Sequence, residues 1–229
     1  MKRQLNKIEI LNNLSPETME RISGCGKIQE VPKGTILIRA REPVGSVYFQ
    51  LSGKSIIYNL NHEGKRKILF ILGKGKLLNE HILNDATSSV YCETLEKSRI
   101  FVVPSTDFMQ IMSEDFALTK HVLAAQERKI RRLSHQLKNT TSSIYLEKKL
   151  AAKLWKLSRD FGLQTEEGIE IDLNLSVTFL ADMLGVPRET TSRACSVLVD
   201  HGLIRMNRKR IVILDPAKIT RFYRTGETK

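Results

Sequence analysis

The sequence contains few cysteines, the residues on which zinc-binding and secreted proteins depend most. Its three cysteines, Cys25, Cys92 and Cys195, are far apart, and no two of them form a Cys-x-x-Cys pair. This spacing argues against a zinc knuckle or an iron–sulfur cluster, and isolated thiols suit a reducing compartment. Residues 1–14 lack the continuous apolar core of a signal peptide, and no stretch of about 18 apolar residues predicts a membrane span. We therefore expect a cytoplasmic protein without membrane contact.

Histidine and aromatic residues are also scarce. The chain has five histidines, no His-x-His pair and only 6% aromatic residues. A metal-dependent oxygenase built on a β-roll needs such a pair, together with a carboxylate, converging on one metal ion. The sequence therefore argues against this class of enzyme, and we expect no catalytic activity.

Positive charge, in contrast, is abundant. The 37 Lys and Arg residues outnumber the 25 Asp and Glu residues, which gives a formal net charge of +12. Such an excess favours an anionic partner, and nucleic acid is the commonest one. The length of 229 residues and the hydrophobic content of 41% allow two modest globular domains.

The first half of the chain has the pattern of a compact β-roll. Short runs rich in β-branched and aromatic residues alternate with turn residues, at 35–38, 47–51, 56–58, 67–72, 90–94 and 100–103. Gly53, Gly64 and Gly75 are each 11 residues apart, and Gly64 suits a hairpin loop that needs a positive φ. Pro104 should end the last strand.

From Ser105 the pattern becomes helical. A short helix should run to about Met112, and a long helix should follow the capping residues at 113–115. Apolar side chains then recur every seven positions, at Phe116, Leu123, Ile130, Leu137 and Ile144. A stripe this narrow favours a coiled-coil seam between two copies of the chain. Packing of the helix on its own β-domain is the alternative.

A polar stretch, Asn139–Ser143, predicts a hinge and a domain boundary. The next helix should run from Ile144 to about Phe161, and Gly162 fits its C-terminal cap. We therefore expect an α+β protein in three parts: a β-roll sensor domain (1–112), a dimerisation helix (113–139) and a C-terminal domain (140–229).

The segment 173–214 of this last domain is typical of a winged helix-turn-helix. Its expected parts, in order, are a helix capped by Ser176 (177–184), a turn containing Gly (185–187), a second helix (188–201) and a β-hairpin with a basic tip (207–210).

The second helix of this segment carries the chemistry of base recognition on one face. Arg188 and Ser192 are four residues apart, as are Glu189 and Arg193, so the two pairs share that face. An arginine can donate two hydrogen bonds to guanine, and a glutamate can accept one from cytosine. Other side chains of the helix and the hairpin tip suit phosphate contacts: Thr190, Arg208, Lys209 and Arg210. The alternative is a solvated face with an internal Glu189–Arg193 ion pair.

At these residues the chain resembles the CRP/FNR superfamily of transcription regulators. Residues 188–193 read Arg-Glu-Thr-Thr-Ser-Arg, which is similar to the start of the family's recognition helix. Residues 32–37 and the later glycines resemble its cyclic-nucleotide-binding type of β-roll, so the similarity covers nearly the whole chain. The resemblance implies a homodimer that reads palindromic TGTGA- or TTGA-type half-sites in double-stranded DNA, one helical turn apart. It implies RNA polymerase as a further partner if the protein is an activator.

The resemblance also implies an effector site in the β-roll. Family members that bind cAMP use a Glu for the ribose, and an Arg-Ser pair about ten residues later for the cyclic phosphate. Here Glu80 matches the Glu and Asn79 replaces the Gly before it, but Ser88-Ser89 occupies the Arg-Ser position. No Arg or Lys occurs between positions 76 and 97, so a cyclic phosphate would lack a charged partner.

We therefore expect an effector other than cAMP, and a purely structural Glu80 carboxylate is the alternative. The candidate pocket comprises Asn79, Glu80, His81, Ser88, Ser89, Ser134 and His135.

A haem- or redox-based gas sensor on the same scaffold is the second functional hypothesis. Only Cys25 lies near the N-terminus, so an iron–sulfur cluster is not expected. The candidate haem ligands are histidines without a recognisable spacing, namely His62, His81, His121 and His135. The sequence therefore leaves the cofactor unassigned, with haem not excluded.

Overall fold

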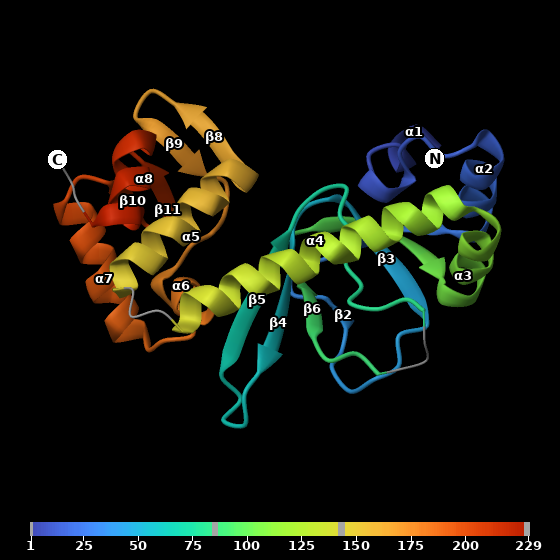
Figure 1. Cartoon of the computed structure of the whole chain (residues 1–229), viewed down its shortest axis with the longest axis horizontal. Helices are drawn as coiled ribbons and strands as arrows, with labels where there is room; N and C mark the ends of the chain where they lie inside the picture. The colour runs from blue at the N-terminus through green and yellow to red at the C-terminus, as the bar shows by residue number, and fades with distance from the viewer. Residues whose placement is uncertain (1, 84–86, 142–144, 227–229) are drawn as a thin grey trace. The chain divides into compact units, whose positions relative to one another are not determined.

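The computed structural model describes residues 2–83, 87–141 and 145–226, and the chain forms two compact units, Met1–His135 and Gln136–Lys229. Figure 1 labels their helices and strands. Among the residues that are described, no helix is long and apolar enough to cross a membrane.

The first unit is a β-roll with helices at both ends of its sequence. Its elements, in order, are α1 (Lys2–Leu5), the 3-10 helix η1 (Glu9–Leu11), α2 (Pro16–Cys25), β1 (Lys27–Val31), β2 (Ile36–Ile38), β3 (Ser46–Ser52), β4 (Ser55–Leu60), β5 (Arg66–Leu72), β6 (Tyr91–Thr94), β7 (Ser98–Pro104), α3 (Ser105–Glu114) and α4 (Phe116–Thr141). The strands form two antiparallel sheets, ordered β1-β7-β3 and β2-β6-β4-β5.

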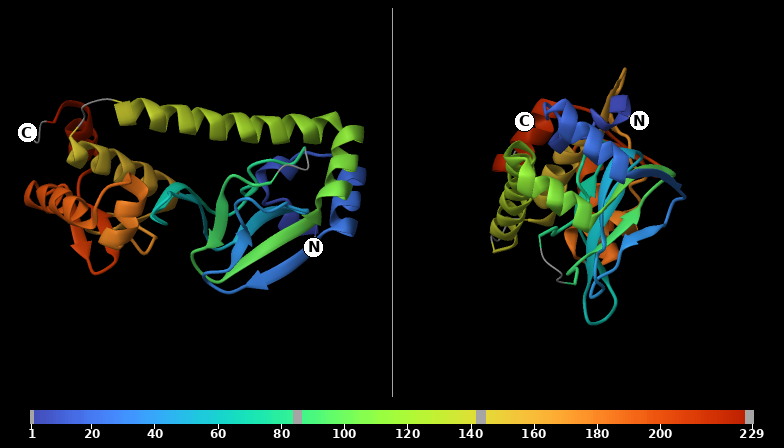
Figure 2. Two further views of the ribbon diagram at one scale, coloured as in Figure 1. Left: turned by 90° about the horizontal axis from the view of Figure 1, so that it is seen from below. Right: turned by 90° about the vertical axis from the view of Figure 1, so that its right-hand side faces the viewer.

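Alternation along β7 separates two cores in this unit. Ile100 and Val102 belong to a cluster inside the roll with Phe70 and Cys92, whereas Phe101 and Val103 pack with the helices. Successive side chains of a strand point to opposite faces, so one strand serves both cores. The long helix α4 lies along the roll (Figure 2) and begins after Asp115, whose carboxylate accepts hydrogen bonds from the backbone N–H groups of Ala117 and Leu118 at 2.8 and 3.1 Å.

The second unit combines helices with a small antiparallel sheet. Its elements are α5 (Leu146–Phe161), β8 (Gly162–Thr165), β9 (Gly168–Ile171), α6 (Val177–Leu184), α7 (Arg188–Asp200), β10 (Ile204–Asn207), β11 (Arg210–Ile213) and α8 (Pro216–Thr225), and the strand order is β10-β11-β9-β8. Buried Leu150, Leu154 and Leu157 form one side of α5, and α5 contacts α6, α7 and α8. This framework supports the helix-turn-helix formed by α6 and α7.

The predicted order of strands and helices is confirmed, from the strands of the roll to the helix-turn-helix and its hairpin. The elements that were not predicted are α1, η1, α2, β1, β8, β9 and α8. The prediction of a polar break at Asn139–Ser143 is wrong for its first residues, because α4 continues through Thr141. Asn and Thr are modest helix formers, but without Gly or Pro they do not end a helix. Residues 142–144 lie outside the described part of the chain.

Gly162 does follow the last residue of α5, but it is not a left-handed cap. Its backbone is extended, with φ of −81° and ψ of 141°. A Cβ atom at this position would lie 2.1 Å from the carbonyl oxygen of Ser158. The glycine is therefore explained by the close approach of β8 to the end of α5.

The N-terminal cap of α6 offers a test of local stability. The Ser176 hydroxyl accepts a hydrogen bond from the backbone N–H of Phe179 at 3.1 Å. We expect Ser176→Ala to lower the free energy of unfolding of the second unit by about 1 kcal/mol. Urea denaturation followed by the fluorescence of Trp155, the single tryptophan, measures this unit.

Ser196→Ala is the matched control, since Ser196 is exposed on α7 and its hydroxyl donates only to the Ser192 carbonyl oxygen one turn earlier. Its effect should stay within about 0.5 kcal/mol. Equal losses in the two variants would contradict a capping role for Ser176.

Candidate functional site

One side of α7 is buried and the other is exposed. Thr191 and Leu198 are fully buried, and Ala194 and Cys195 are nearly so. The exposed residues of the first two turns are Arg188, Glu189, Thr190, Ser192 and Arg193. The predicted separation of an inner apolar face from an outer polar face is therefore present.

The turn before α7 sets the position of this outer face. Gly185 has a left-handed backbone with φ of 75°, and its N–H donates to the carbonyl oxygen of Ala181 at 2.7 Å. A glycine adopts this conformation without the strain that a side chain would add. The hydroxyl of Thr191 donates to the Pro187 carbonyl oxygen at 3.1 Å, which anchors the first turn of α7 from inside.

The charged groups of the outer face have no internal partner in the described residues. No ion pair there involves Arg188, Glu189 or Arg193, and the alternative of an internal Glu189–Arg193 pair is therefore not supported. Two guanidinium groups and one carboxylate remain exposed to solvent. Such groups can make hydrogen bonds to an external molecule without first breaking an internal pair.

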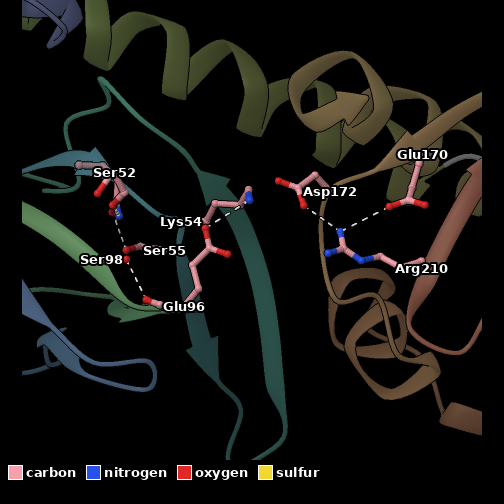
Figure 3. Close-up of polar contacts among 9 residues, drawn as sticks. Ser52, Lys54, Ser55, Glu96, Ser98, Glu170, Asp172 and Arg210 are labelled. Atoms are coloured by element: carbon pink, nitrogen blue, oxygen red, sulfur yellow. Dashed lines mark hydrogen bonds and ion pairs between the residues drawn. The ribbon is translucent and has the colours of Figure 1, made fainter. Parts of the chain in front are cut away.

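Of the four cations of the β10–β11 hairpin, two form ion pairs within the described residues and two do not. Arg205 pairs with Glu167 at 2.5 Å, and Arg210 pairs with Asp172 at 2.8 Å and Glu170 at 3.8 Å, so both contact the neighbouring β9 strand or the turn before it. Figure 3 shows the contacts of Arg210. The tip residues Arg208 and Lys209 are exposed, and no ion pair among described residues includes them.

Arg208 has a φ of 55°, which places it at the reversal of the chain. The hairpin therefore presents two cations outward, whereas Arg210, which was predicted together with them, begins β11 directly after the turn and is paired with Glu170 and Asp172.

In the roll, Glu80 gathers the two serines of the candidate pocket. Its carboxylate accepts hydrogen bonds from the Ser89 N–H at 2.9 Å, from the Ser89 hydroxyl, and from the Ser88 hydroxyl at 3.3 Å. These contacts match the alternative in which Glu80 is a structural carboxylate tied to its own loop.

Asn79 is buried and faces β3. Its side-chain oxygen accepts from the Tyr48 N–H at 2.7 Å, and its amide donates to the Ser46 carbonyl oxygen at 2.8 Å. His81, two residues later in the chain, is partly buried. Ser134 and His135 are exposed on α4, and no hydrogen bond within the described chain joins either of them to the loop.

Two α4 side chains that the sequence did not indicate do reach this loop. The ammonium group of Lys129 donates to the Asn79 carbonyl oxygen at 2.5 Å, and the Gln126 amide donates to the Glu80 carbonyl oxygen at 3.1 Å. Burial lowers the pKa of Lys129 to about 8. The spacing of the inner residues Leu118, Val122 and Leu133 along α4 could have identified Lys129, because it lies on the same face.

The cysteines and histidines do not gather. Among the described residues no three His, Cys, Asp or Glu side chains are placed to hold a metal ion together. His62 is exposed in the β4–β5 loop, and His121 bonds to the Ile10 carbonyl oxygen at 3.0 Å. Burial raises the pKa of the Cys92 thiol to about 12 and that of the Cys195 thiol to about 11.

The fold defines a class of protein: a β-roll sensor architecture followed by a winged helix-turn-helix. Comparison with protein families supports both parts. Residues 28–115 match the cyclic nucleotide-binding domain, and residues 148–222 match the Crp-like helix-turn-helix domain. Together the two matches span more than half of the chain.

Curated relatives and solved structures agree with these matches. The chain is 28% identical over 213 residues to a probable transcriptional regulator, flp, of Lacticaseibacillus casei, covering 91% of this chain and 92% of that protein. It is 21% identical to a CRP-like cAMP-activated global transcriptional regulator of Mycobacterium tuberculosis, covering 95% and 97% of the two chains.

A structure of a putative crp/fnr-family regulator from Eubacterium rectale has the same fold, with a TM-score of 0.76, 21% identity and coverage of 96% and 100%. The chain belongs to the CRP/FNR family of transcription regulators, with an effector-binding roll and a DNA-binding helix-turn-helix.

The raised thiol pKa values predict slow alkylation of two cysteines. The thiolate is the reactive form, and a group whose pKa is raised to about 11 or 12 stays protonated at pH 8. With iodoacetamide at pH 8 we expect partly exposed Cys25 to be labelled first, and Cys92 and Cys195 only after unfolding in urea. Mass spectrometry of tryptic peptides measures the order. Rapid labelling of Cys92 in the folded protein would favour a redox sensor instead.

Proposed function

We propose that the chain is a homodimeric transcription regulator that binds palindromic DNA with TGTGA- or TTGA-type half-sites and responds to a small-molecule effector other than cAMP. The observation that carries the proposal is the outer face of α7, where Arg188, Glu189 and Arg193 are exposed and form no ion pair with any described residue.

The chemistry of these three side chains suits the edges of G·C pairs. A guanidinium can donate to O6 and N7 of guanine, and a carboxylate can accept from N4 of cytosine. Glu189 and Arg193 lie one helical turn apart, so together they suit neighbouring base pairs in one major groove. The remaining polar groups would hold phosphates and position the helix: Thr190, Ser192, Arg208 and Lys209.

The dimer is proposed from the two faces of α4. Its inner face packs against the roll through Leu118, Val122 and Leu133. Its outer stripe is left uncovered in one chain, with Phe116 at 71%, Leu123 at 48% and Ile130 at 63% exposure. Apolar side chains at a spacing of seven residues fit a second copy of the same helix. Two copies would present two α7 helices to a palindrome.

The effector is proposed to differ from cAMP because of the contacts that Glu80 makes and the residues that its loop contains. The Glu80 carboxylate is occupied by Ser88 and Ser89, and the loop itself supplies no cation. The names of the relatives point to different signals, since they include a cAMP-activated regulator and a global nitrogen regulator. Effector binding would act by shifting the equilibrium between DNA-binding and non-binding arrangements. RNA polymerase would be a partner if the protein activates transcription.

Arg193→Ala tests the proposed base readout. We expect a loss of about 1–3 kcal/mol in binding to a TGTGA/TTGA palindrome and a weaker preference over random DNA. Fluorescence anisotropy at physiological salt measures both affinities. Equal, weak binding of the unchanged protein to palindrome and random duplex would reject the proposal.

Two hairpin variants serve as controls for this experiment. Lys209→Ala should weaken binding to all duplexes alike and lower the slope of log K against log salt by about one. Arg205→Ala should change that slope much less, because Arg205 is paired with Glu167. Equal changes in slope would contradict the assignment of Lys209 to phosphate.

Ile130→Glu tests the seam. A carboxylate at the centre of the stripe would face its own copy, and unpaired charge is costly to bury. We expect sedimentation to report a shift from dimer to monomer, together with loss of palindrome preference. Arg131→Glu, an exposed neighbour outside the stripe, should remain dimeric. A dimeric Ile130→Glu protein would place the interface elsewhere.

A further inference from the structure

Lys129 is a charged residue on the side of α4 that otherwise packs apolar side chains against the roll. It lies on the inner face of α4, between Val122 and Leu133, both of which pack into the cores of the roll. Its ammonium group makes one hydrogen bond, to the Asn79 carbonyl oxygen. No carboxylate among the described residues pairs with it within 4.0 Å.

An ammonium group has three N–H donors, so two donors of Lys129 remain available. Among the described residues, Glu80 is the carboxylate whose charge acts on Lys129, and the two form no ion pair within 4.0 Å. The Cys92 thiol, which belongs to the core of the roll, is neutral because burial raises its pKa to about 12. The Glu80 carboxylate is engaged by Ser88 and Ser89.

A second cation lies on the same helix face. The Arg132 guanidinium sits over the ring of Phe70, with its central carbon 5.1 Å from the ring centroid. Lys129 and Arg132 therefore bring two positive charges to the side of α4 that faces the roll, and Glu80 is the one carboxylate among the described loop residues 77–83 and 87–90. A partly buried ammonium group whose one hydrogen-bond acceptor is a neutral carbonyl is costly, so Lys129 points to an anionic partner that is not part of the chain.

We propose that Lys129 is the anion-binding group of the effector site, and that the effector carries a phosphate or carboxylate whose oxygens accept its two available N–H donors. This inference rests on the proposed function only in that the roll binds an effector, and it does not depend on the readout of DNA. It also explains how the site can lack a cation in its own loop: α4 supplies the charge.

The position of Lys129 links an anion directly to the dimer seam. Ile130, the next residue, belongs to the exposed stripe of α4. A charge-assisted hydrogen bond to the ammonium is stronger than the present bond to a neutral carbonyl, so an anion would compete with Asn79 for Lys129. The loop would then be held to α4 through the ligand as well as through Gln126.

The pH dependence follows from the protonation of Lys129. Burial lowers the pKa of this group to about 8 in the folded chain, and Arg132 also lowers it, whereas Glu80 and the Cys92 site oppose the shift. A lysine loses its charge as the pH rises through its pKa. Anion binding should therefore be strong at pH 7 and should weaken as the pH rises above about 8.

The test uses the full chain and four anions, with chloride added to hold the ionic strength constant. Inorganic phosphate and phenyl phosphate represent the phosphate class, and citrate and benzoate represent the carboxylate class. Thermal unfolding at pH 7 reports binding, because a ligand of the folded state raises the unfolding temperature. We expect one class to raise it in a saturable way, which also identifies the source of the anionic oxygens.

The variants decide whether Lys129 is responsible. Lys129→Met should reduce the affinity for that anion at least tenfold, Lys129→Arg should retain most of it, and Lys120→Met, an exposed lysine of the same helix, should not change it. An absence of saturable protection by all four anions, or equal protection in Lys129→Met, would overturn the inference.

A ligand-free measurement adds an independent arm. If the ammonium lacks an anionic partner, Lys129→Met should raise the unfolding temperature without any anion by roughly 2–4 °C. A fall would indicate a structural bond to Asn79 and would overturn the inference. Neither result touches the DNA proposal, which fails only if the unchanged protein shows no sequence preference.

Discussion

The packing of one side of α7 determines which of its side chains are available to DNA. Thr191, Ala194, Cys195 and Leu198 are buried, so the helix cannot rotate about its axis without exposing apolar surface, at a cost of roughly 25 cal/mol per Å². The left-handed Gly185 sets where the helix begins. The guanidinium and carboxylate groups face outward because the opposite side is committed to the core. Base recognition depends on that rotational setting, since a turn of about 100° per residue would replace one set of contacts with another.

The long helix α4 differs from α7, because two of its faces carry apolar residues. The inner face closes the roll, and the outer stripe is exposed in one chain, where we propose that a second copy packs. A charged residue on the inner face is the exception to this pattern. Positions that break a local rule while the surrounding structure obeys it are often functional, and Lys129 is such a position. Lys129, which contacts the loop, and Ile130 of the proposed seam are neighbours on α4. In the proposed dimer this adjacency would couple an effector signal to the arrangement of the two chains.

Much of this could be predicted from the sequence, and the exceptions have physical causes. Strands β3 to β7 are apolar runs with turns between them, and the two faces of α7 follow from helical periodicity. Strand β1, with Lys27 and Glu30, and the exposed hairpin of β8 and β9 carry too little apolar residue content to be predicted by such patterns. The N-terminal α2 did leave a signal, in the capping residue Ser15 before Pro16.

The sensor site was only partly accessible in this way. Asn79, Glu80, Ser88 and Ser89 form a local segment whose residues could be recognised together. Lys129 comes from another part of the chain, about forty residues later, and pairing across such a distance depends on tertiary packing. A search of the loop alone therefore indicated no cation, although the folded roll contains one.

The base recognition proposed for α7 can be tested by selection from a library of random DNA duplexes with the purified protein. We expect enrichment of an inverted repeat whose half-sites contain neighbouring G·C pairs and lie one helical turn apart, about 10 base pairs from centre to centre. A selected pool with no more symmetry or G·C positioning than the starting library would contradict it.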